Sequence, residues 1–115
     1  MLRRKQYMSE SDLYLNDIKR MIKSIEETTK GKSFNDFLKD PNLSDASTLR
    51  LQIIGESIKK LSKKSKKKHL EIWRNFEKTR DVISHDYFTL NPQIIWDKVT
   101  IELPELKKFI NKTKW

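Results

Sequence analysis

The chain has 115 residues, 36% of them hydrophobic and 36% charged, which fits one domain over residues 1–115 with a modest core. It contains no cysteine, which excludes disulfide bonds, thiolate metal sites and thiol nucleophiles. No apolar run comes near the roughly 20 residues of a membrane-spanning helix, so we expect a cytoplasmic protein that does not enter a membrane.

The first predicted helix begins near Ser9 or Ser11 and ends at Gly31, because serine favours helix N-termini and glycine favours C-termini. Apolar residues at helical spacing give it one buried stripe: Tyr14, Ile18, Met21, Ile22 and Ile25. A short helix is expected after Ser33, and Asp40-Pro41-Asn42 is expected to break the chain before the next helix.

A second long helix is predicted from a cap at Ser44 into the lysine-rich segment 59–68, where it ends or frays. Its expected core residues are either Leu49 or Leu51, together with Ile53, Ile54, Ile58 and Leu61. Gly55 lies mid-helix, where glycine costs ~1 kcal/mol relative to alanine. We therefore expect its missing side chain to allow close packing against another helix.

Two further helices complete the predicted fold. The third carries the apolar residues Ile72, Trp73, Phe76, Ile83 and Tyr87. The fourth begins with Asn91 as a cap and Pro92 in its first turn, and Pro104 should kink it. Its apolar residues are Ile95, Val99, Leu103, Leu106 and Ile110. The pattern predicts an all-α protein, an up-down four-helix bundle with a short extra helix.

Most of the formal charge of +9 is concentrated in residues 59–68, between the second and third predicted helices. This segment contains no acidic residue and seven lysines: Lys59, Lys60, Lys63, Lys64, Lys66, Lys67 and Lys68. The cluster could bind a polyanion such as RNA or DNA, or an acidic partner protein. It could equally be a solvated helix end. Charge alone leaves these possibilities open.

The third predicted helix carries an arginine in its apolar stripe. Phe76, Arg80, Ile83 and Tyr87 are spaced i, i+4, i+7 and i+11, so they share one helix face. A guanidinium among core residues usually has a buried partner or an anionic ligand, and its planar fork fits phosphate oxygens. Tyr87 by itself could be a core or interface aromatic residue.

Side chains suited to acid–base chemistry follow the arginine. Asp81 precedes His85 by one turn, so its carboxylate could orient the imidazole of a general acid or base. The pair could also be an ordinary surface contact. Ser84 does not indicate a serine triad, because His69 and His85 are the only histidines. With these two histidines and this spacing of acids, we expect no metal site and no cofactor.

The segment Arg80-Asp81-Val82-Ile83-Ser84-His85-Asp86-Tyr87 matches R-x4-H-x-Y, and the chain thereby resembles the HEPN-domain ribonucleases. Further blocks are similar to the HepT-like branch of that superfamily: Tyr14–Ile18, Phe34–Leu38, Leu51–Ser57, Trp73, Ile95-Trp96 and Leu103–Leu106. The resemblance covers residues 12–110. Two positions depart from it, since Asp81 stands where asparagine is frequent and Asp86 stands where glycine is frequent.

The resemblance implies a HEPN-type bundle that acts as a homodimer, with the two signature motifs facing each other across a cleft. It also implies a toxin of a type II toxin–antitoxin pair. The cognate antitoxin would be a minimal nucleotidyltransferase that attaches AMP to the motif tyrosine, here Tyr87. An AMP group there would block phosphate from Arg80 and His85. Asp86 would place a negative charge beside the RNA phosphate that binds at Arg80 and His85.

Cleavage of RNA without metal needs a base, an acid and a cation, and leaves a 2′,3′-cyclic phosphate because the 2′-OH is the nucleophile. We assign the cation to Arg80 and the acid–base role to His85, with support from Asp81 and Ser84. Tyr87 and the lysine-rich segment would contact RNA. The alternatives are a non-catalytic HEPN module that a nucleotidyltransferase partner binds and modifies, and a small DNA-binding regulator.

Overall fold

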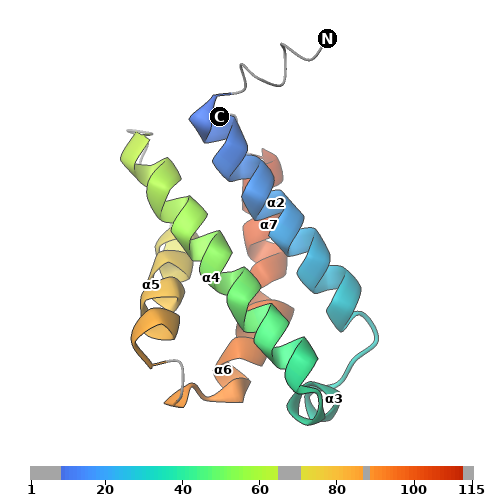
Figure 1. Ribbon diagram of the computed structural model, residues 1–115. Coiled ribbons are helices and arrows are strands. Elements are labelled where there is room, and N and C mark those ends of the chain that lie inside the picture. The colour runs from blue at the N-terminus through green and yellow to red at the C-terminus, as the bar shows by residue number, and fades with distance from the viewer. Residues whose placement is uncertain (1–8, 65–70, 87–88, 113–115) are drawn as a thin grey trace.

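The computed structural model describes residues 9–64, 71–86 and 89–112 (Figure 1). In these ranges it contains helices and no strand, which confirms the all-α prediction. The helices are α2 (Glu10–Thr29), α3 (Phe34–Lys39), α4 (Pro41–Lys64), α5 (Glu71–Asp86), α6 (Pro92–Asp97) and α7 (Leu103–Lys112), with a π-helical turn, η2 (Lys98–Glu102), joining the last two.

The long helices form an antiparallel bundle. Figure 1 shows α2 and α5 running in one direction, and α4 and α7 in the other. Helix α4 packs against both α2 and α5, and α7 contacts the same two helices from the opposite side. The short helices α3 and α6 touch each other at one end of the bundle. The predicted up-down bundle with a short extra helix is therefore confirmed.

The buried apolar side chains form one cluster between these helices. Trp73 and Phe37 are its largest fully buried members, and Phe37 stacks against Trp96 with ring centroids 5.1 Å apart. On α4 the core residue is Leu51, because Leu49 points outward. Ile53 was expected in the core but is only half-buried and lies outside it, since it shares the outer face of α4 with Leu49.

Helix α4 begins one turn earlier than its sequence suggests. The expected break is present at Asp40, which separates α3 from α4, but the expected cap at Ser44 is wrong, because Pro41 is the first residue of the helix. The Asp40 side chain accepts a hydrogen bond from the N–H of Leu43 at 3.2 Å, as a capping residue does. Proline is well tolerated in a first turn, where its missing N–H has no intrahelical partner.

The fourth predicted helix is interrupted just before Pro104. Asn91 caps its start by accepting a hydrogen bond from the N–H of Gln93 at 2.9 Å, as predicted. The N–H of Leu103 then bonds to the carbonyl of Lys98, five residues back, which gives the π-helical turn. Because a proline ring clashes with the preceding helical turn, this wider turn accommodates Pro104.

Candidate active site

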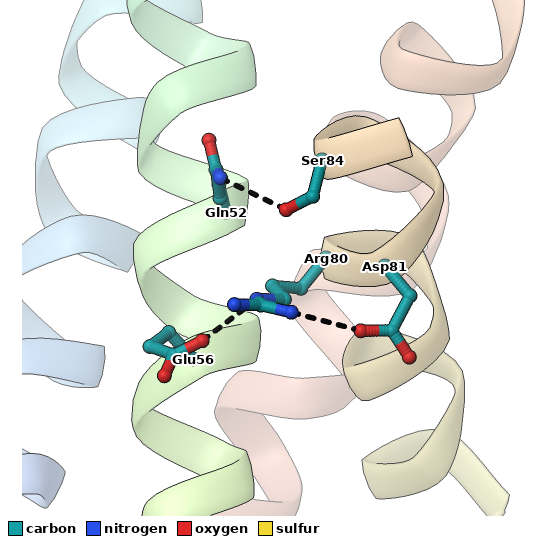
Figure 2. A network of polar contacts seen from close by, with 5 residues as sticks. All are labelled: Gln52, Glu56, Arg80, Asp81 and Ser84. Carbon is teal, nitrogen blue, oxygen red and sulfur yellow. Dashed lines mark hydrogen bonds and ion pairs between the residues drawn. The ribbon is translucent and has the colours of Figure 1, made fainter. Parts of the chain in front are cut away.

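The site begins at Gly55, where α4 packs closely against α5. A Cβ atom on Gly55 would overlap Cβ of Arg80 and lie 2.6 Å from the backbone oxygen of Phe76. This confirms the prediction that the glycine permits close helix packing. The side chain of Arg80 extends from α5 toward α4, between the two helices (Figure 2).

Two carboxylates bind the guanidinium of Arg80 in the seam between α4 and α5 (Figure 2). Nε of Arg80 lies 2.7 Å from Oε2 of Glu56 on α4, and both atoms are buried. Nη1 donates to Oδ1 of Asp81 at 3.1 Å. The side chains differ in exposure, which is 27% for Arg80, 37% for Glu56 and 52% for Asp81. The arginine is thus contacted by Glu56 through buried atoms and by Asp81 from the more exposed side.

A second polar contact joins the same helices one turn further along. Nε2 of Gln52 on α4 donates to Oγ of Ser84 on α5 at 3.1 Å (Figure 2). Gln52 and Glu56 are four residues apart, as are Ser84 and Arg80, so the antiparallel helices pair them in register. Ser84 is therefore held by α4 and has no contact with His85 among the described residues.

The expected hydrogen bond between Asp81 and His85 is not present, because the Asp81 carboxylate turns to Arg80 instead. His85 lies exposed in the last turn of α5 and makes no polar contact with another described residue. A separation of five residues places it about 140° around the helix from Arg80. A single chain therefore presents the arginine in the seam and the imidazole on the outer surface.

The other predicted contact residues are described only in part. Tyr87 follows the last residue of α5 and lies outside the described residues, as do Lys66, Lys67 and Lys68. The segment 59–68 is not wholly a connection between helices, because α4 continues to Lys64. Lys59 is half-buried, and Nζ of Lys60 lies 5.8 Å from the ring centre of Tyr14. Lys63 and Lys64 belong to the last turn of α4.

Glu56 and Gln52 are the site residues that sequence reasoning did not assign a role. Both lie in the Leu51–Ser57 block, whose spacing shows only that they sit on one side of α4. The four-residue spacing that they share with Arg80 and Ser84 is the available signal, and it becomes meaningful only once α4 is known to pack beside α5.

No group of three or more histidine, cysteine or acidic side chains among the described residues is placed to hold a metal ion. Among the helices of this part of the chain, none has both the length and the apolar character required to cross a membrane.

Comparison with known proteins identifies the family. The sequence model described as "Ribonuclease HepT-like" matches residues 18–113, which include the whole of the site. A protein of Caldanaerobacter subterraneus named "Putative RNase TTE0752" is 40% identical over 100 residues, 86% of this chain and 89% of the relative. "Probable ribonuclease HepT" of Thermococcus cleftensis is 37% identical over 102 residues, 88% of this chain and 93% of that protein.

A third relative is longer than this chain. The Methanocaldococcus jannaschii protein named "Gamma-glutamylcyclotransferase and putative RNase MJ0434" is 39% identical over 101 residues, and the match spans 46% of its length. No solved structure matches the chain. The family model covers most of the sequence and two relatives align over nearly their full length, so this chain belongs to the HepT-like ribonuclease family.

Proposed function

We propose that this protein is a metal-independent endoribonuclease and the toxin of a type II toxin–antitoxin pair. The observation that carries the proposal is the placement of the family motif. Arg80 lies where α4 packs closely against α5 at Gly55, and His85 is exposed on the same helix, within reach of a large substrate. Membership in a ribonuclease family supports RNA as the substrate.

In this mechanism Arg80 stabilises the charge that develops on the phosphate, and His85 transfers protons at the 2′-OH or the leaving oxygen. The motif supplies one imidazole per chain, that of His85, which is too few for both transfers and supports a homodimer that brings two motifs together. The products would end in a 2′,3′-cyclic phosphate. The lysine-rich segment 59–68 would follow the RNA backbone.

We further propose that a minimal nucleotidyltransferase is the antitoxin and that it transfers the AMP group of ATP to the hydroxyl of Tyr87, with release of pyrophosphate. Tyr87 comes directly after α5 and two residues after His85. An added nucleotide at that position brings negative charge and bulk beside the catalytic groups, so RNA would be excluded from them. Intact mass after incubation with the partner and ATP tests this step.

The test of the ribonuclease is cleavage of total RNA by purified protein in the presence of a chelator. Wild type should yield products ending in cyclic phosphate, whereas Arg80→Ala and His85→Ala should yield none. Arg20→Ala and His69→Ala are matched controls, since each removes the same residue type outside the motif and should cleave like wild type. Equal cleavage by His85→Ala and wild type would refute the proposed mechanism.

One observation favours the alternative of a non-catalytic module. Both carboxylates that contact Arg80 already neutralise the cation that RNA would need. A module of this kind would show no cleavage in any variant and would gain the mass of AMP on Tyr87 when the nucleotidyltransferase is present. The same set of proteins therefore separates the two functions.

A further inference from the structure

The two acids on Arg80 hold it in different ways. Glu56 belongs to the neighbouring helix α4, and its Oε2 and the arginine Nε are both buried. The packing of Gly55 against Arg80 fixes the distance between the helices at this point. Glu56 therefore reaches Arg80 from a neighbouring helix whose position is fixed here, and it meets Nε as a buried ion pair at 2.7 Å.

Asp81 is the next residue of α5 itself and reaches the guanidinium from the solvent side. Its side chain is more exposed than those of Arg80 and Glu56, and it contacts Nη1 of the arginine. Exposed ion pairs of this kind contribute little free energy and exchange readily with other ligands. The Asp81 contact can break by rotation of one side chain, with no movement of a helix.

We propose that Asp81 is a displaceable competitor that occupies the phosphate-binding edge of Arg80, and that Glu56 is a positioning residue that fixes the guanidinium plane. This proposal rests on the proposed function and adds its regulation. A phosphate of RNA that binds Nη1 must compete with the Asp81 carboxylate, because the two anions repel each other at the same nitrogen. The occupied arginine is then the resting state of the site.

The assignment predicts opposite effects for two isosteric substitutions. Asp81→Asn removes the competing charge and keeps the shape, so KM for RNA should fall about two- to five-fold, the range of an exposed ion pair. Glu56→Gln weakens the hold on Nε, so kcat should fall about ten-fold or more because the guanidinium is misplaced. If Asp81 and Glu56 only stabilised the fold, activity would fall in both variants.

Matched controls separate these effects from net charge and from general ion-pair loss. Asp17→Asn makes the same change in another exposed pair, with Arg20 on α2. Glu26→Gln makes the same change in the ion pair between α2 and Lys107 of α7. Urea unfolding of all four variants shows whether each is folded at the assay temperature. Glu56→Asp keeps the charge and should recover part of kcat if positioning is the role of Glu56.

A binding experiment tests this proposal independently of the proposed ribonuclease activity. The probe is an all-2′-deoxy oligonucleotide, which has no 2′-OH and so is bound without cleavage. Asp81→Asn should bind it about two- to five-fold more tightly than Asp17→Asn does. If wild type cleaves no RNA, the proposed function fails, and this comparison still decides the role of Asp81.

Two results would overturn the inference. Equal KM and equal oligonucleotide affinity in Asp81→Asn and Asp17→Asn would show that Asp81 does not compete for Arg80. An unchanged kcat in a folded Glu56→Gln, matching Glu26→Gln, would show that the guanidinium is positioned without Glu56.

Discussion

At Gly55 the backbone of α4 lies so close to α5 that a methyl group has no space, and the residue it would meet is Arg80. A side chain that binds phosphate must start from a fixed backbone position. The contact at Gly55 fixes the backbone position of Arg80. Glycine inside a helix is less stable than alanine, but here it permits the close packing that defines the position of the guanidinium.

We therefore predict that Gly55→Ala destabilises the protein by about 1–3 kcal/mol, as overpacking does. In a helix with free space around the glycine, the same change would stabilise the protein by up to about 1 kcal/mol. Whether the free energy of unfolding falls or rises therefore shows whether Gly55 is packed against α5. Urea unfolding measures it. RNA cleavage should fall as well, because the methyl group displaces Arg80. A gain in stability would show that α5 is not packed against this position.

A second prediction at the residue scale concerns Asp36. Its pKa is lowered from the ordinary value of 3.8, first because the carboxylate accepts a hydrogen bond from the backbone N–H of Ser33 and then from the Ser33 side-chain contact. A depressed folded pKa gives stability above the unfolded value that is lost as pH falls through the folded one. Asp36→Ala should be less stable than wild type at neutral pH.

The stability gap between these two proteins should narrow as pH falls below 3.8. Urea unfolding at several pH values measures the gap. A difference that is the same at every pH would show that the Asp36 charge does not stabilise the capping box of α3.

At the scale of elements, the start of α4 depends on Asp40 and Pro41 rather than on Ser44. The Asp40 carboxylate caps the helix, whereas the Ser44 hydroxyl only donates to the carbonyl of Pro41 at 3.3 Å. Local signals allow both starts, since Asp and Ser are both good caps. The start at Asp40 is chosen because it places Leu43 in the core.

We predict that Asp40→Ala costs about 1 kcal/mol of stability, the usual effect of losing a cap. Ser44→Ala should cost much less, because serine inside a helix is no better than alanine. Thermal unfolding of the two variants compares them directly. A larger loss of stability in Ser44→Ala than in Asp40→Ala would show that the helix is capped at Ser44.

At the scale of the whole molecule, the outer face of α4 has the features expected where a second copy would pack. Leu49, Ile53 and Glu56 are spaced i, i+4 and i+7 and so lie on one face, next to the Arg80 site. Leu49 is 56% exposed, and Ile53 lies outside the core. A homodimer with facing motifs would cover these apolar side chains.

Leu49→Glu should therefore convert a dimer into a folded monomer and abolish RNA cleavage, because it buries an unpaired charge in the interface. Ile101→Glu is the control, since Ile101 on η2 is 60% exposed and lies on a different helix. Light scattering after size exclusion gives the mass of each variant. A dimer that persists in Leu49→Glu would place the interface elsewhere.

The four helices and most of the core follow from the sequence, because helical periodicity is local and the caps at Ser9, Ser33 and Asn91 act over a few residues. The last described residue of α4 is Lys64, inside the lysine-rich segment where the sequence predicts that the helix ends or frays. Lysine is a good helix former, so a charged run does not end a helix by itself.

The motif residues Arg80 and His85 are predicted from the sequence alone, because they lie five residues apart in one segment and belong to a recognisable pattern. Only the tertiary structure decided that Arg80 pairs with Glu56 and Asp81, that Asp81 leaves His85 alone, and that Gly55 faces Arg80. These contacts depend on the register between α4 and α5. Register is set by packing between segments far apart in the chain, which no local pattern records.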